Sequence, residues 1–340
     1  MIHSRDIFID FARAVALLIM FFAHLLPHFS VTDIDSYFLF RLLSSSAAPL
    51  FLFLTGLNFS NKQTLKDVFS KAFVFLGLAA FIDVVLWQII PFYSFDVLYC
   101  IGFGYPLLYF FSKARKWIQL AVIFGILLLS FQLQQNYQHV IAEHDINQWS
   151  QFEWNEVLVN FFYNGWFPVF PWLFFMLIGV LSKADQLHNR MRNWPGFLIG
   201  LATSAFSIYS LKNGELFLPE MAVELFYPAH FMFMIYAISF LYLFWFLQPI
   251  IAKRKETFFL GEFGRYSLFY YLLHLTILTL FTSIIDQVIA LQWNSIFLLL
   301  LVYICFLSLL FSFVWLIRLF KTSYFYQRNR QRLVVRMFFH

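Results

Sequence analysis

The range Phe8–Phe29 reads FIDFARAVALLIMFFAHLLPHF and is apolar except for Asp10, Arg13, His24 and His28. A run of this length is sufficient to cross the hydrocarbon core of a bilayer as one helix. Each ionisable side chain at that depth costs roughly 2.5–3.5 kcal/mol on insertion scales, so such groups are expected where they have a function. The stretch therefore predicts a membrane span that carries a functional polar face.

The spacing of these residues places them on one stripe of the helix. Arg13 and His24 are eleven residues apart, which leaves them about 20° apart on one face. With the amino terminus inside, Arg13 would lie about 7 Å and His24 about 24 Å past the inner boundary. A cation–carboxylate pair of Arg13 and Asp10 is thus expected near one membrane surface, and imidazoles near the other.

The rest of the chain is equally apolar. Hydrophobic residues make up 61% and charged residues 12% of the 340, and the mean hydropathy is +0.74. This composition predicts an all-α, polytopic integral membrane protein, because backbone hydrogen bonds in lipid must be made within helices. About ten spans are expected, at 8–29, 38–59, 70–90, 96–111, 117–132, 167–182, 196–211, 226–247, 266–285 and 295–318.

Loop charges orient these spans. Of the 23 Lys and Arg residues, all but Arg13, Arg41 and Lys212 fall in the even-numbered loops and the two tails. The positive-inside rule then predicts that both termini are cytoplasmic. Topology accounts for the basic pI of 9.1, so no nucleic-acid partner is expected. A single membrane domain is predicted for 1–320, followed by a basic cytoplasmic tail at 321–340 that contacts membrane lipid.

Other polar residues extend the candidate interior. Asp83, His230 and His274 each interrupt a predicted span, and structural pairing is the default interpretation for any one of them. His24 and His28 have metal-ligand spacing, but neither an H-E-x-x-H pattern nor a cysteine cluster accompanies them, so no metal site is predicted.

The predicted outer segment Gln132–Glu156 holds acidic and aromatic side chains and no Lys or Arg. It is interpreted as a solvated loop or as a surface for a sugar acceptor.

Several segments resemble known membrane acyltransferases. Arg13, ten residues and then His24 match a motif of the membrane acyltransferase-3 family, and Asp10-Phe-Ala-Arg13 with Met20 is similar to the heparan-α-glucosaminide N-acetyltransferase family. Ala14 departs from the pattern, since relatives usually have Gly there. Four further segments agree in order and spacing: PLFLFLTG at 49–56, DVLYCIG at 96–102, FPVFPW at 167–172 and GRYSLFYYLLH at 264–274.

This resemblance implies an acyltransferase that moves an acyl group, usually acetyl, from cytoplasmic acyl-CoA to a carbohydrate hydroxyl or amine on the far side. It implies that Arg13, with Arg265, binds the CoA phosphates and that Asp10 orients Arg13. His24 would be the base or the acyl carrier, with His274 as a supporting catalytic residue and Asp83 as a weaker candidate. A bacterial inner membrane is expected, because the chain is compact and lacks a targeting segment.

The alternative is a proton-coupled transporter or flippase for a sugar or lipid-linked glycan, since embedded charges also serve proton coupling. Against it, the sequence shows no inverted-repeat symmetry. The sequence leaves open the acceptor, O- versus N-acylation, the acyl chain length, ping-pong versus ternary kinetics, and whether the chain forms a homo-oligomer.

Overall fold

The computed structural model describes residues 7–29, 34–136, 144–185, 194–213, 229, 231–251, 255–289, 296–329 and 331–339. Every named element within these ranges is a helix. Extended pairing among them is limited to one isolated antiparallel bridge between Ile89 and Asp145. The all-α prediction is confirmed, as expected for apolar segments that satisfy their backbone groups locally.

Six helices in the described part of the chain are long and apolar enough to cross a membrane: Ile7–Leu25, Ser36–Asn58, Leu65–Trp87, Lys116–Leu133, Trp194–Asn213 and Ile296–Thr322. A helix pair bent by 47°, Trp154–Asn164 with Val169–Lys183, would be a seventh span. Phe231–Phe246 and Ser267–Leu280 are shorter apolar helices. The predicted number of ten spans, and the sides on which the termini lie, stay predictions.

The chain packs as two compact units. Unit 1 comprises Met1–Ala48, Glu215–Glu224 and Phe244–His340, and unit 2 comprises Pro49–Gly214 and Leu225–Leu243. The expected single domain over 1–320 stays a prediction, and the two units are described separately.

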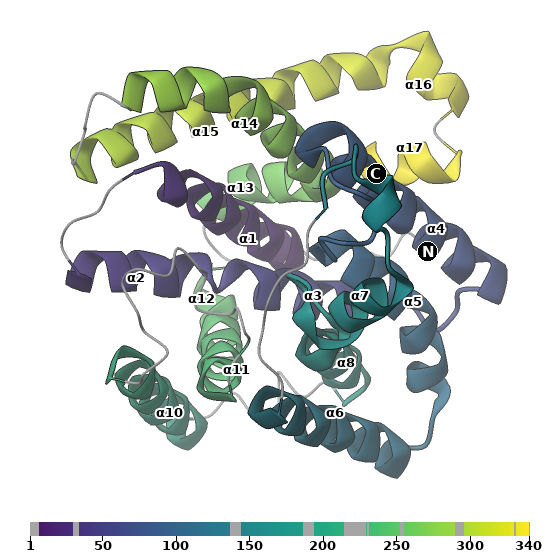
Figure 1. Ribbon diagram of the computed structural model, residues 1–340, viewed down its shortest axis with the longest axis vertical. Coiled ribbons are helices and arrows are strands. Elements are labelled where there is room, and N and C mark those ends of the chain that lie inside the picture. Colours follow the sequence, from purple (N-terminus) through teal and green to yellow (C-terminus); the bar gives the residue numbers. More distant parts are fainter. Residues whose placement is uncertain are drawn as a thin grey trace. The chain divides into compact units, whose positions relative to one another are not determined.

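Unit 1 is built around α1 (Ile7–Leu25), which ends in a short 3₁₀ turn, η1 (Leu26–His28), at Pro27. α1 lies against α13, α14 and α15 (Figure 1). Its small buried residues, among them Ala12 and Ala16, let these neighbours approach closely. The Tyr303 hydroxyl donates to the Leu18 carbonyl over 2.8 Å and ties α15 to α1. The other helices of unit 1 have these bounds: α2 (Ile34–Ser44), α12 (Gln248–Ile251), α13 (Lys255–Arg265), α14 (Ser267–Ile289), α15 (Ile296–Thr322), α16 (Tyr324–Asn329) and α17 (Leu333–Phe339).

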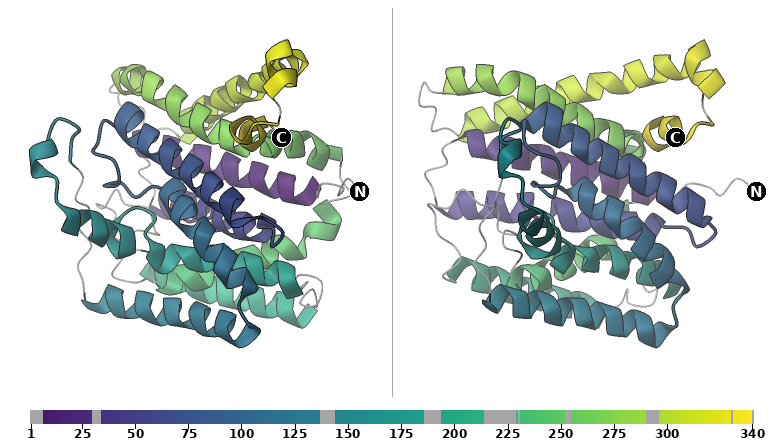
Figure 2. Two further views of the ribbon diagram at one scale, coloured as in Figure 1. Left: turned by 90° about the vertical axis from the view of Figure 1, so that its right-hand side faces the viewer. Right: turned by 45° about the vertical axis from the view of Figure 1, so that its right-hand side comes forward.

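Unit 2 contains an antiparallel pair, α4 (Leu65–Phe81) and α5 (Val97–Lys113), seen in blue in Figure 2. α4 begins with a capping box formed by Thr64 and Asp67 and ends in a π-helical turn, η2 (Ile82–Trp87). α8 packs against α5 and α6. The remaining elements are α3 (Ala47–Asn58), α6 (Lys116–Asn136), η3 (Trp149–Gln151), α7 (Trp154–Val159), η4 (Asn160–Asn164), α8 (Val169–Asp185), α10 (Trp194–Asn213) and α11 (Phe231–Phe246); α3 and α11 each extend beyond unit 2 at one end.

Candidate active site

The first turns of α1 hold the expected ion pair. Arg13 Nη1 donates to Asp10 Oδ1 over 3.0 Å. The Asp10 side chain is buried, whereas that of Arg13 is 23% exposed. The bond to Asp10 orients the guanidinium of Arg13, a group with five N–H donors.

A glycine places α13 directly on this turn. A Cβ built on Gly264 would lie 1.8 Å from the Asp10 carbonyl oxygen and 2.6 Å from the Ala14 nitrogen. No side chain fits in that space, so the two helix backbones touch. Arg265 follows Gly264 directly and its side chain is exposed. The contact therefore brings a second guanidinium-bearing residue to the end of α1 that holds Arg13.

The other end of α1 brings two histidines together. The ring centroids of His24 and His274 lie 5.2 Å apart. His24 is exposed in the last turn of α1, and His274 is fully buried in α14. Phe21 packs against the His274 ring at a centroid distance of 4.7 Å. The two imidazoles thus differ in solvent access: that of His24 is exposed, whereas that of His274 is enclosed.

The hydrogen bonding of His274 fixes its tautomer. Nδ1 lies 3.0 Å from the Tyr270 carbonyl oxygen, and a carbonyl only accepts, so Nδ1 carries the proton. In a neutral imidazole the other nitrogen, Nε2, then has a lone pair. This atom is buried and has no hydrogen-bond partner among the described residues. The site therefore holds a buried acceptor on a ring next to His24.

Asp83 belongs to a different arrangement, in unit 2. Its fully buried carboxylate accepts hydrogen bonds from the Ser94 hydroxyl (2.6 Å), the Tyr99 hydroxyl (2.7 Å) and the Phe92 amide (3.1 Å). The segment that it holds has positive φ at Gln88, Phe92 and Phe95, a conformation that non-glycine residues adopt rarely. Asp83 thus stabilises a strained connection between η2 and α5.

Some of these contacts were not predicted from the sequence. The Tyr270–His274 bond was detectable, because residues four apart on a helix lie over one another. Gly264 was noted only as the first residue of the segment 264–274, and its contact with α1 was not predicted. The partners of Asp83 lie within or beyond a non-helical connection, so helix periodicity could not indicate them. His230 and the side chain of His28 lie outside the described residues.

These features define an integral membrane protein whose first helix carries an ion pair near one end and an exposed histidine at the other. A model of the heparan-alpha-glucosaminide N-acetyltransferase catalytic domain matches residues 5–212. The chain belongs to this acetyltransferase family. No curated protein and no solved structure matches. Asp10, Arg13 and His24 lie within the matched residues, whereas Arg265 and His274 follow them.

Proposed function

We propose that this protein transfers an acetyl or other acyl group from cytoplasmic acyl-CoA to a hydroxyl or amine of an extracytoplasmic carbohydrate. Family membership supports acetyl transfer. The observation that carries the finer proposal is the pair of His24 and His274, placed on the same helix bundle as the Asp10–Arg13 ion pair.

The distribution of charge supports the direction of transfer. The basic residues of the predicted cytoplasmic loops would place the Arg13 end of α1 near the cytoplasm and the His24 end near the opposite surface. An acyl-CoA is too highly charged to cross lipid, whereas its thioester end can enter a protein-lined path. Arg13 and Arg265 would bind the CoA phosphates, since guanidinium groups pair well with phosphate oxygens.

The two imidazoles would handle the proton of the acceptor. His24 takes the proton as the acceptor oxygen or nitrogen attacks the thioester carbonyl carbon. The tetrahedral intermediate then collapses, the C–S bond breaks, and the CoA thiolate leaves and takes up a proton. The lone pair on His274 Nε2 would accept an N–H from His24, which leaves the second nitrogen of His24 unprotonated and able to act as the base.

The geometry is compatible with this relay. Two imidazoles joined by an N–H···N bond of roughly 3 Å have centroids about 5 Å apart, close to the 5.2 Å observed. In the proposed mechanism the exposed His24 ring rotates to direct an N–H at the buried acceptor.

The first test is release of free CoA from acetyl-CoA by purified protein, with and without a carbohydrate acceptor. The wild type should release CoA, and His24→Ala should lose at least about 100-fold in rate, the usual contribution of a general base. Donor binding, measured in the same samples, should be unchanged. Cys305→Ala, an exposed position on α15, is the control and should retain full activity.

Substantial turnover by His24→Ala would remove His24 from the chemistry. If acetyl-CoA neither binds nor reacts, and vesicles show proton-dependent sugar uptake instead, the protein is a transporter. A bacterial inner membrane is the proposed location, with membrane lipid and the carbohydrate acceptor as partners.

A further inference from the structure

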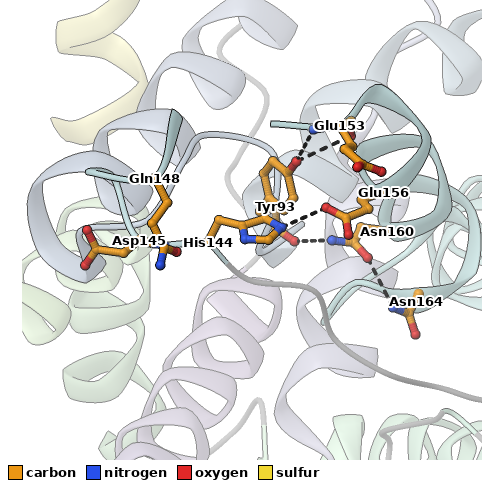
Figure 3. A network of polar contacts seen from close by, with 8 residues as sticks. All are labelled: Tyr93, His144, Asp145, Gln148, Glu153, Glu156, Asn160 and Asn164. Atoms are coloured by element: carbon orange, nitrogen blue, oxygen red, sulfur yellow. Dashed lines mark hydrogen bonds and ion pairs between the residues drawn. The ribbon is translucent and has the colours of Figure 1, made fainter. Parts of the chain in front are cut away.

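A polar network in unit 2 holds one segment rigidly against another (Figure 3). The Tyr93 hydroxyl accepts from the Glu153 amide over 2.7 Å and lies 3.3 Å from the carbonyl oxygen of the same residue. Asn160 Nδ2 donates to the Tyr93 carbonyl over 2.7 Å, and Asn164 Nδ2 donates to Asn160 Oδ1. Tyr93 and Asn160 are fully buried. Both the amide and the carbonyl of Glu153 are thus held by the Tyr93 hydroxyl.

Further contacts fix the preceding residues. His144 Nε2 lies 2.8 Å from Glu156 Oε2. The Ile90 amide donates to the His144 carbonyl (2.9 Å), and the Ile146 amide donates to the Gln88 carbonyl (2.8 Å). Residues 144–160 are therefore attached to residues 88–93 at both ends and in the middle.

This segment carries an aromatic platform, which consists of Trp149, Phe152 and Trp154. Trp149 is 55% and Trp154 70% exposed. Phe152 lies between them, stacked on Trp149 at a centroid distance of 6.2 Å and edge-on to Trp154 at 5.0 Å. Large indole rings on a fixed backbone offer contact area with little entropy left to lose on binding.

Hydrogen-bonding groups surround the aromatic platform. The exposed polar residues beside it on the chain all have side chains that can accept hydrogen bonds: Asp145, Asn147, Gln148, Ser150, Gln151, Glu153 and Asn155. The sequence has no Lys or Arg between Lys116 and Lys183. From this segment an anionic ligand would meet carboxylates and no Lys or Arg, whereas hydroxyl and ammonium groups would find acceptors.

The aromatic platform lies at the opposite end of α5 from a basic turn. Lys113, Arg115 and Lys116 occupy the turn that joins α5 to α6, whereas the aromatic platform adjoins the connection from η2 to α5, at the other end of α5 (Figure 2). The positive-inside rule assigns the basic end to the cytoplasm, so the platform would face the acceptor side.

We infer that the aromatic platform is a docking site for a non-anionic saccharide, neutral or bearing amino groups. The inference rests on the proposed function, because it narrows the class of carbohydrate acceptor. The apolar C–H face of a pyranose ring packs on the exposed indoles, and its hydroxyl or ammonium groups donate to the surrounding carboxylates and amides. The charge of the segment disfavours uronate or sulfated saccharides.

Binding of three defined probes tests this inference on the full chain in nanodiscs. The probes are chitotriose (neutral), the trimer of glucosamine (cationic) and a heparin tetrasaccharide (anionic). Omitting acyl-CoA separates this experiment from the proposed transfer chemistry, because binding of the probes is then measured without any acyl transfer. We expect a non-anionic probe to bind, and Trp149→Ala and Trp154→Ala each to raise its Kd about tenfold through lost apolar contact.

Matched variants define the outcome. Trp117→Ala removes an equally exposed indole, 65% exposed, at the basic end of the same unit and should leave binding unchanged. Trp154→Phe should recover most of the affinity. Glu153→Gln should weaken the cationic probe more than the neutral one.

The inference fails if neither non-anionic probe binds, if the heparin tetrasaccharide binds more tightly, or if both alanine variants bind as the wild type does. It also fails if brominated lipid tails quench the fluorescence that Trp149 and Trp154 contribute. In that case the aromatic platform is a membrane-interface belt. None of these outcomes would contradict the proposed acyl transfer, which is tested separately by CoA release and donor binding.

Discussion

Gly264 of α13 lies against the Asp10 carbonyl of α1 so closely that an added Cβ would stand 1.8 Å from that oxygen. The Ala14 nitrogen would be 2.6 Å from the added Cβ. This nitrogen and the Asp10 oxygen both belong to the helix backbone, so neither can move aside as a flexible side chain would. We predict that Gly264→Ala separates α13 from α1 and destabilises the protein by about 1–3 kcal/mol, as overpacking does elsewhere. Thermal or chemical unfolding in detergent measures this change.

Gly125→Ala is the matched control, because a Cβ on this helical glycine meets no heavy atom within 4 Å. That substitution should stabilise α6 by about 0.5–1 kcal/mol through a less flexible unfolded chain. Equal effects of the two substitutions would show that the contact between α1 and α13 is looser than described.

The tautomer of His274 leads to a prediction about two similar amides. His274→Gln places a polar terminus near the position of Nε2 and retains an acceptor there, whereas His274→Asn replaces only the Nδ1 side of the ring. We expect His274→Gln to keep more acyl-transfer activity than His274→Asn, by about tenfold, a difference of 1.4 kcal/mol in barrier. The turnover number at saturating acetyl-CoA measures this, because donor affinity should not change.

A reversed order of the two amide variants would exclude Nε2 as the acceptor for His24. A purely structural role of His274 would lower the melting temperature of both variants and leave the turnover number of the folded fraction unaltered. Measuring stability and turnover on the same preparations separates these cases.

The extent to which this site follows from sequence differs from residue to residue. The pairing of Asp10 with Arg13 and their shared face with His24 followed from helix periodicity, which needs only local geometry. The proximity of His24 to His274 did not, because it depends on how α1 and α14 pack, and motif order alone suggested it. Helix content followed from composition, because apolar segments satisfy their backbone groups within helices. The number of spans stays a prediction, since the bend of 47° between Trp154–Asn164 and Val169–Lys183 depends on packing and not on composition.

Asp83 is predicted to contribute to the free energy of unfolding and not to acyl transfer. Asp83→Ala leaves the donors of Ser94, Tyr99 and Phe92 without their acceptor and releases a strained connection. The cost should be on the order of 3 kcal/mol, given the desolvation of buried donors. Unfolding midpoints measure it, and acetyl-CoA binding by the remaining folded protein should persist.

Asp67→Ala is the control for this carboxylate, because Asp67 is an exposed capping residue of α4, the helix that leads into η2. Its removal should cost about 1 kcal/mol, as for other caps. If Asp83→Ala were no more harmful than Asp67→Ala, the Asp83 hydrogen bonds would not hold the connection.

Tyr93 should make stability depend on alkaline pH. Burial, with the nearby carboxylate of Glu156 adding to it, raises the pKa of Tyr93 above its ordinary value of 10.0. The folded state therefore keeps the phenol proton more strongly than the unfolded state. This contribution is complete below the unfolded pKa and is lost as pH rises from about 10 toward the folded pKa.

Tyr93→Phe tests this dependence. The variant loses the hydroxyl that binds the Glu153 backbone and should be about 1–2 kcal/mol less stable than the wild type at pH 8. The difference between the two should shrink above pH 10, because only the wild type carries the titrating phenol. A difference that stays constant across pH 8–11 would contradict the assignment.

Arg13 supplies the prediction for the donor end of the site. Asp10 orients it through a 3.0 Å bond to Nη1, and 23% of its side chain is exposed, so part of the side chain is accessible to a phosphate oxygen. Arg13→Ala should raise the Kd for CoA about tenfold, since a charge-assisted contact of this kind is worth roughly 1.5–3 kcal/mol at most. The Kd of Arg13→Lys should fall between those of the wild type and Arg13→Ala, because an ammonium keeps the charge without the paired donors.

Arg328→Ala is the control, because it removes an exposed cation of α16 in the same unit. This variant should bind CoA as the wild type does at moderate salt. An equal loss in Arg328→Ala would show that long-range attraction accounts for donor binding, in which case raising the ionic strength should abolish the effect of both substitutions.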